Sequence, residues 1–220
     1  NINSSLVWMK RNRTQIVLTF DDGFKCQKKL VDECLNPRNL KALFFVPTEF
    51  IGLTGEDAFE FTKFNFYPDS EPRKLPNGGY DAMTWNDLRS LVSDGHIIGG
   101  HTATHPKLSK ISEPELLREI IDSADLLENK LNTEVCHFAY PFGSLDTVNV
   151  AAFEVTKQRF KWGYSNIRGI FNESPSKHFI YRQNVVPGTS IKLVKAAVDG
   201  LLDIRYRKQR SAAWLNYGEV

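Results

Sequence analysis

The sequence predicts an α/β fold in which short buried strands alternate with helices along 220 residues. Apolar runs such as Ile16–Phe20 and Ala42–Val46 have the length and composition of buried strands. Apolar residues at helical spacing fill several of the longer stretches between such runs, and this alternation is typical of α/β proteins. The length suits one domain with a sizeable core, so we expect a single domain over residues 1–220.

The chain begins with two predicted strands on either side of a helix. The strand Ile16–Phe20 consists mainly of β-branched, aliphatic and aromatic residues, and a helical pattern follows over Lys25–Leu35. Pro37 and Asn39 are expected to end this helix before the strand Ala42–Val46.

The segment from Gly52 to Asp81 fits no regular element, and a helix at Trp85 follows it. A loop of this length is usually functional or disordered, and its aromatic residues argue against full disorder. Two interpretations remain open: a lid or wall beside a binding site, or a short helix and hairpin that patch the side of the fold. The aromatic residues are Phe59, Phe61, Phe64, Phe66 and Tyr67.

The middle of the chain predicts a short strand and a long helix. The strand Ile97–Gly100 is apolar and has glycines where another backbone can come close. Ser112 is a good helix cap, because Pro114 and acidic residues follow in the first turn. The helix Glu115–Leu131 then carries apolar residues at helical spacing. They are Leu116, Leu117, Ile120, Ile121, Ala124, Leu127 and Leu131.

The last third of the chain continues the alternation. We expect the strand Val135–Tyr140, the helix Val148–Phe160, the strand Trp162–Ser165 and the helix Ile191–Leu202. The basic tail Arg205–Arg210 is expected to be a solvated face, with a role at an anionic membrane surface as the alternative.

Composition narrows the possible partners and locations. Hydrophobic residues at 41% and charged residues at 25% are ordinary for a soluble globular protein. The net charge of +2 gives no nucleic-acid signal, and no apolar run is long enough to span a membrane. Residues Asn1–Lys10 lack the pattern of a signal peptide, and the odd number of cysteines (Cys26, Cys34 and Cys136) favours free thiols in a reducing compartment. We therefore expect the cytoplasm, or the periplasm or exterior if a signal was removed.

Two adjacent aspartates follow the first strand. Asp21 and Asp22 repel each other and are costly to bury unless a cation or hydrogen bonds compensate. Side chains alternate between the faces of a strand, but this rule loosens at its end, so one aspartate can face a metal and the other a substrate. A strand-ending turn with an aspartate cap before Gly23 is the alternative.

A pair of histidines about eighty residues later favours the metal interpretation. His101 and His105 follow the strand Ile97–Gly100, and Pro106 biases the second histidine away from a helix. The pair is therefore expected on a strand end and its following loop, unlike the helical histidine motif of metalloproteases. Together with the aspartates, it supplies three ligands for a divalent ion and a spare carboxylate that can deprotonate a bound water.

Three motifs stand in a fixed order along the chain, and together they resemble the polysaccharide deacetylases, metal-dependent enzymes that remove acetyl groups from sugars. The resemblance covers roughly Gln15 to Pro187, and it implies a distorted, incomplete parallel (β/α) barrel with its site at the C-terminal ends of the strands. The motifs are Thr19-Phe20-Asp21-Asp22-Gly23, His101-Thr102-Ala103-Thr104-His105 and Phe138-Ala139-Tyr140-Pro141-Phe142-Gly143, with weaker support from Ala42–Pro47 and Met83-Thr84-Trp85.

The resemblance implies a role for each site residue. Asp21 would be the general base, which must be free to accept a proton, whereas a ligand carboxylate must stay ionised. The implied metal ligands are Asp22, His101 and His105, and the two threonines of the histidine motif could hydrogen-bond around them. The backbone N–H of Tyr140 would help to hold the developing oxyanion.

The chain departs from the family pattern in two places. Many members carry an arginine at the position of Ala139 that orients the base aspartate, and Arg182 is the best candidate to replace it by pairing with Asp21. Many members also end with a Leu-x-His segment whose histidine is the general acid. Here the last histidine is His178, and Leu201-Leu202-Asp203 has an aspartate instead.

The sequence therefore predicts a metal-dependent carbohydrate deacetylase. Asp21 deprotonates metal-bound water, which attacks an acetyl carbonyl, and acetate leaves. We expect an N-acetylated or O-acetylated sugar of a bacterial surface polysaccharide or its precursor, and zinc as the ion, with cobalt, nickel, iron or manganese as alternatives. A weak or inactive sugar- or metal-binding relative, and a two-histidine, one-carboxylate iron enzyme, are the competing hypotheses. An iron enzyme of this kind needs no second carboxylate, so the adjacent Asp21 argues against it. The sequence does not indicate an oligomeric state.

Overall fold

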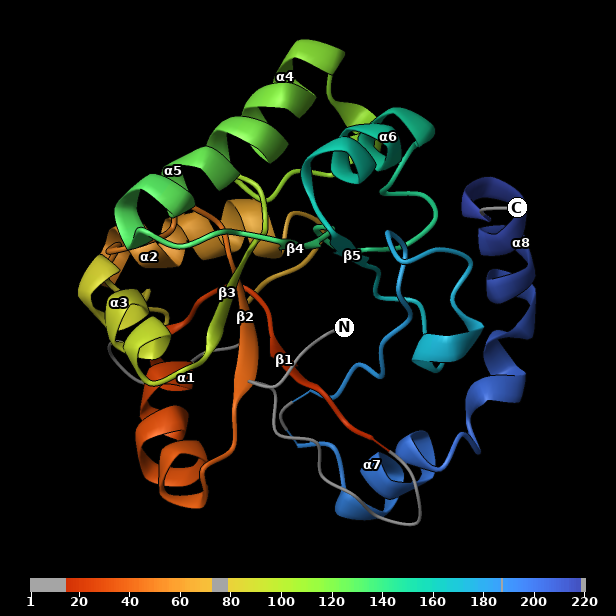
Figure 1. Ribbon diagram of the computed structural model, residues 1–220, viewed down its shortest axis with the longest axis horizontal. Coiled ribbons are helices and arrows are strands. Elements are labelled where there is room, and N and C mark those ends of the chain that lie inside the picture. Colours follow the sequence, from red (N-terminus) through yellow and green to blue (C-terminus); the bar gives the residue numbers. More distant parts are fainter. Residues whose placement is uncertain (1–14, 73–78, 187, 219–220) are drawn as a thin grey trace. The chain divides into compact units, whose positions relative to one another are not determined.

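A computed structural model describes residues 15–72, 79–186 and 188–218, which divide into two compact units (Figure 1). The first unit contains the described chain up to His105 together with Arg118–Val135. The second contains Pro106–Leu117 and the chain from Cys136 onward. The expectation about a signal peptide rests on Asn1–Lys10, which lie outside the described residues.

The fold is an incomplete parallel (β/α) barrel, which confirms the expected fold class. Its strands follow one another in chain order, and the strand pairs within each unit are parallel. Parallel strands need crossover connections, and helical segments provide them here. The strands are β1 (Leu18–Phe20), β2 (Ala42–Val46), β3 (Ile97–Gly100), β4 (His137–Ala139) and β5 (Trp162–Tyr164).

In the first unit, β2 lies between β1 and β3 (Figure 1). It is buried along its whole length, as expected for a parallel strand covered on both faces. Phe20 of β1 is the register partner of Phe44, and Gly100 of β3 is the partner of Val46. The C-terminal ends of β1 and β3 therefore lie at one edge of the sheet, on either side of β2.

The helices of the first unit follow the predicted pattern with one local change. The predicted helix Lys25–Leu35 forms, but its second half is a π turn, and Asn39 ends the following turn with a φ of 51°. A capping box between Thr84 and Asp87 begins the helix at Trp85. The segments are α1 (Lys25–Leu30), η1 (Val31–Leu35), η2 (Asn36–Arg38), α3 (Trp85–Ser93), η5 (Arg118–Asp122) and α5 (Ser123–Leu131).

The prediction that Gly52–Asp81 fits no regular element is wrong. The segment forms α2 (Gly55–Phe61), continued by the π turn η3 (Thr62–Phe66), while residues 73–78 lie outside the described part. The cause is aromatic packing. The ring centroid of Phe66 lies 5.1 Å from that of Phe50 and 5.5 Å from that of Phe61. Such packing stabilises a helix despite the glycine, proline and charged residues that suggested a loop. The helix agrees with the interpretation in which a short helix patches the side of the fold.

In the second unit, α6 (Val150–Arg159) contacts α4 (Glu113–Leu117), α8 (Arg207–Tyr217) and β5. The basic tail Arg205–Arg210 is mostly exposed, which confirms the predicted solvated face. It leads into a helix that Tyr217 anchors, because its ring stacks on Phe179 at 4.2 Å and its hydroxyl donates to the Val148 carbonyl. The segments are η4 (Leu108–Lys110), α4 (Glu113–Leu117), α6 (Val150–Arg159), η6 (Phe171–Glu173), α7 (Ile191–Val198), η7 (Asp203–Tyr206) and α8 (Arg207–Tyr217). Among the described residues, no helix combines the length and apolar character of a membrane span.

Candidate functional site

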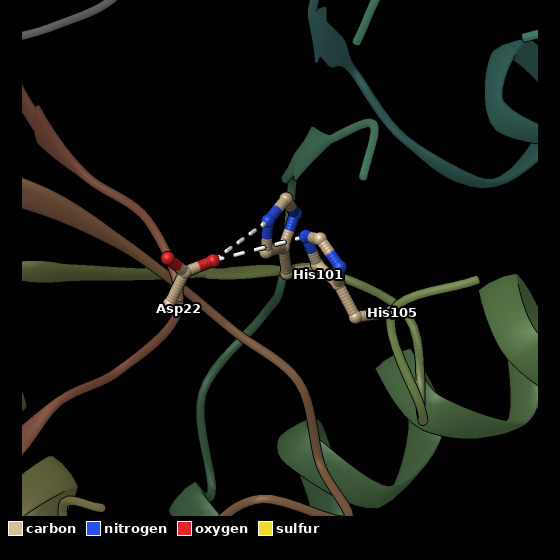
Figure 2. A group of neighbouring side chains, drawn as sticks. All are labelled: Asp22, His101 and His105. Carbon is tan, nitrogen blue, oxygen red and sulfur yellow. Dashed lines mark ion pairs between the residues drawn. The ribbon is translucent and has the colours of Figure 1, made fainter. Parts of the chain in front are cut away.

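Three side chains of the first unit point toward one another (Figure 2). Nε2 of His101 lies 3.6 Å and Nε2 of His105 lies 3.7 Å from the same Oδ1 atom of Asp22, and the three ligand atoms lie within 4.8 Å of one another. These distances are too long for hydrogen bonds. They are close to the roughly 3.4 Å that separates two ligands of a tetrahedral zinc ion with bonds of about 2.1 Å. The donor set therefore fits a divalent ion.

The strand register explains this convergence. Phe20 pairs with Phe44, so Asp22, two residues further on, comes level with Val46. Val46 in turn pairs with Gly100, which directly precedes His101. Parallel strands thus deliver the aspartate and the first histidine to the same level of one sheet edge.

Burial sets the charge state of the second histidine. His105 is buried, and this burial, with the neighbouring His101 as a smaller cause, lowers its pKa to about 4. The nearby carboxylates of Asp22 and Asp21 oppose this shift only in part. At neutral pH the imidazole is therefore uncharged, which is the form that binds a metal.

The π turn η3 orients the His105 ring. Nδ1 of His105 lies 3.0 Å from the carbonyl oxygen of Asn65, and the ring of Phe66 meets the imidazole edge to face at 4.8 Å. Because a carbonyl only accepts hydrogen bonds, Nδ1 carries the proton and Nε2 keeps a lone pair on the side of Asp22. The aromatic segment Gly52–Asp81, which contains η3, therefore supports a candidate metal ligand.

The backbone at the site adopts conformations that are unusual for residues with side chains. Asp22, Thr102 and His105 have φ angles of 75°, 68° and 63°. Such residues cost roughly 1–3 kcal/mol each and cluster at functional sites, where surrounding contacts hold them. Gly23, with φ of 80°, is required in the aspartate turn, because a Cβ there would lie 2.9 Å from Cγ1 of Val46.

The hydroxyl groups of both threonines in the histidine loop form hydrogen bonds. The Thr102 hydroxyl donates to the carbonyl of His101 at 2.5 Å and accepts the N–H of His105 at 2.9 Å. The Thr104 hydroxyl donates to Glu119 at 2.9 Å. Sequence reasoning missed Glu119, although one signal was present: an acidic residue stands in the inward-facing stripe of a helix beside Ile120.

Tyr140 and Arg182 belong to the second unit, and their predicted roles toward Asp21 and the oxyanion stay predictions. The N–H of Tyr140 donates to the carbonyl of Tyr164 at 3.0 Å, and its hydroxyl donates to the carbonyl of His178 at 2.9 Å. Burial raises the pKa of the Tyr140 phenol, so it stays protonated. Nε of Arg182 donates to a backbone carbonyl of this unit at 2.8 Å.

Comparison with known proteins gives a consistent result. The model of the family described as polysaccharide deacetylase matches residues 9–159. The peptidoglycan-N-acetylglucosamine deacetylase of Bacillus cereus is 27% identical over 153 residues, which cover 69% of this chain and 41% of that protein. The chain thus spans less than half the length of this relative.

Two solved structures share the fold. The Streptococcus pyogenes deacetylase PplD in complex with acetate has a TM-score of 0.64 and 20% identity, covering 84% of this chain and 71% of that chain. IcaB from Ammonifex degensii has a TM-score of 0.63 and 19% identity, covering 84% of this chain and 76% of that chain. Because the family model matches well over half of the sequence, we conclude that the chain belongs to the polysaccharide deacetylase family.

Proposed function

We propose that this protein, as one catalytic domain over residues 1–220, removes acetyl groups from a sugar of a polysaccharide or its precursor. A divalent ion held by Asp22, His101 and His105 assists the hydrolysis. The observation that carries the proposal is the convergence of these three ligand atoms within 4.8 Å in a polysaccharide deacetylase fold. Zinc suits two imidazoles and a carboxylate, and cobalt, nickel, iron and manganese accept similar sets.

Asp21 is the proposed general base. When bound, the ion supplies Lewis-acid activation of water and of the acetyl carbonyl. Asp21 stands outside the converging set and accepts the proton of the attacking water. Its carbonyl accepts the N–H of Gly23 at 3.0 Å and the side-chain amide of Gln27 at 2.6 Å, which support the turn that presents it. One water is consumed, the bond from the acetyl carbon to the sugar nitrogen or oxygen breaks, and acetate leaves.

Two residues of the second unit complete the proposal. Arg182 keeps Asp21 ionised, since an opposite charge nearby lowers the pKa of a carboxylate. The N–H of Tyr140 stabilises the oxyanion, which requires that it exchange its hydrogen bond to the carbonyl of Tyr164.

The substrate that we infer is an N-acetylated amino sugar in a bacterial surface polysaccharide. The Bacillus cereus relative is named for the N-acetylglucosamine of peptidoglycan, which supports this substrate class. O-acetylated sugars are the alternative, because the same base and ion can hydrolyse an ester.

Acetate release tests the proposal. The protein is stripped with a chelator, reloaded with each of several divalent ions, and incubated with N-acetylated and O-acetylated oligosaccharides. We expect acetate only from reloaded protein. A protein that binds the ion and the sugars but releases no acetate is a binding relative, and one that consumes oxygen with ferrous iron alone is an iron enzyme; either result would overturn the proposal.

A further inference from the structure

We propose that Glu119 is a positioning residue, whose buried carboxylate holds the loop 101–105 in the shape that aims His101 and His105 at the ion. The inference rests on the proposed metal site and adds the group that shapes it. Glu119 acts on the imidazoles through the loop backbone.

The carboxylate of Glu119 binds the middle of the loop with both oxygens. Oε2 accepts the N–H groups of Ala103 at 2.9 Å and Thr104 at 2.8 Å, and Oε1 accepts the Thr104 hydroxyl at 2.9 Å. Hydrogen bonds to an ionised carboxylate are stronger than neutral ones. Two of the three residues between the histidines of the motif, Ala103 and Thr104, are thus fixed by one side chain.

Two backbone hydrogen bonds hold the opposite edge of the loop. The carbonyls of Thr102 and Ala103 accept the N–H groups of Thr48 and Glu49 at 3.1 and 3.0 Å. These bonds come from the chain just after β2 and use carbonyl groups of the loop, while the N–H groups of Ala103 and Thr104 donate to Glu119. Glu119 is therefore the side chain that completes the hydrogen bonding of the peptide groups at the centre of the loop.

The loop needs such support because of its conformation. Thr102 and His105 both have φ in the left-handed region, at 68° and 63°. Residues with a Cβ keep this conformation only where surrounding contacts over-determine it. Without the carboxylate, we expect the loop to relax and the two Nε2 atoms to lose their common direction.

The buried carboxylate of Glu119 needs hydrogen-bond donors, and the loop supplies them in this conformation. Its side chain is 2% exposed, and a carboxylate is costly to bury unless donors surround it. The loop supplies three donors, and the Arg118 guanidinium adds a contact at 2.7 Å while also reaching Glu49 at 3.3 Å. Glu119 also lies in the π turn η5, and π turns inside helices are frequent at functional sites.

Zinc affinity of the stripped protein tests the role of Glu119. A chromophoric chelator competes for zinc with the wild type, Glu119→Ala, Glu119→Gln and the control Glu128→Gln. Glu128 lies on α5 and accepts the N–H of Val135 at 2.8 Å, so its variant reports the loss of a carboxylate charge at another helix-to-backbone contact. We expect about a 10- to 100-fold weaker affinity for Glu119→Ala. Glu119→Gln should lie between, because one amide oxygen can still accept two N–H groups, and Glu128→Gln should match the wild type.

Amide hydrogen exchange gives another readout that needs no ion. In the stripped protein, the Ala103 and Thr104 amides should exchange about tenfold or more faster in Glu119→Ala than in the wild type, with α5 unchanged. If Glu119→Ala does not fold, Glu119→Gln carries both measurements. A folded Glu119→Ala with wild-type zinc affinity would refute the role of Glu119 alone, whereas a wild type that binds no zinc would refute the metal site.

Discussion

His105 in the first unit and His137 in the second unit are alike in burial, but the groups that they face differ. Burial is the main cause that lowers the pKa of each to about 4. Nε2 of His105 faces Oδ1 of Asp22 at 3.7 Å, beside a second imidazole. Nδ1 of His137 instead lies 3.0 Å from the hydroxyl of Tyr164. A buried histidine with a lowered pKa is therefore no sign of a metal ligand by itself; the chemistry of its partners decides.

The backbones of the two histidines differ in the same sense. His137 belongs to β4, in regular parallel pairing with β5. His105 lies in a loop with φ of 63°, supported by Asn65, Thr102 and the Glu119 carboxylate beside it. The backbone is therefore unusual at His105, whose ring faces Asp22, and regular at His137, whose ring contacts the hydroxyl of Tyr164.

Metal content gives the largest expected contrast. His105→Ala should reduce bound divalent ion from about one per chain to nearly none, because it removes one of three ligands. His137→Gln should keep the wild-type stoichiometry. Elemental analysis of both purified variants measures this, with circular dichroism to check folding. Equal metal content in the two variants would break the comparison.

Substitutions of the two adjacent aspartates should have different effects on turnover and on metal binding. Asp21→Asn should retain the ion and lose turnover by roughly two to four orders of magnitude, as expected for a lost general base. Asp22→Asn should weaken ion binding, since it replaces an ionised ligand by a neutral one. Acetate release and metal titration on the same samples measure both effects. Near-normal turnover in Asp21→Asn would assign the base to another group.

Arg182→Met tests the proposed partner of Asp21. Loss of the positive charge should raise the pKa of a neighbouring carboxylate by roughly one to three units. The acidic limb of the pH–rate profile should move upward accordingly, while metal content stays constant. An unshifted acidic limb would exclude Arg182 from this role.

The pH dependence of stability should reveal His137. Its pKa is about 4 in the folded protein, against an ordinary value of about 6.5, so the unfolded chain takes up the proton first. Stability is then complete above about pH 6.5 and falls as the pH drops toward 4, by about 3 kcal/mol at most. Urea unfolding of metal-free protein at several pH values should show this loss, and it should be smaller in His137→Gln. A variant with the wild-type slope would mean that His137 does not titrate as described.

Substitutions in the aromatic segment should have the smallest effects, and these effects should differ between the packed Phe66 and the exposed Phe64. Phe66→Leu should cost about 1 kcal/mol of stability from lost ring contacts and slightly weaken metal affinity through His105. Phe64 is 67% exposed, so Phe64→Ala should leave the melting temperature unchanged. If the segment also forms a sugar-stacking wall, Phe64→Ala should raise KM. Unchanged KM across a panel of sugars would leave the segment with a supporting role only.

Some features of this protein follow from the sequence alone. The strands Ala42–Val46 and Ile97–Gly100 have the bounds predicted for them, because short buried runs end sharply at proline or at a polar motif. The fold class and family follow from three motifs in fixed order, and both are confirmed. The family resemblance placed the site at the C-terminal ends of the strands, so the positions of Asp22 and the histidines after strand ends already indicated that they lie close together.

Other features were decided only by tertiary packing. Asn65 lies 40 residues before His105, and Glu119 lies 15 and 16 residues after the N–H groups that it accepts. Hydrophobic periodicity reports which face of an element is buried, but not which polar group will meet it there. The aromatic cluster likewise turned an apparent loop into α2. These contacts give the histidine loop its shape, because a strained backbone persists only where separate parts of the fold converge on it.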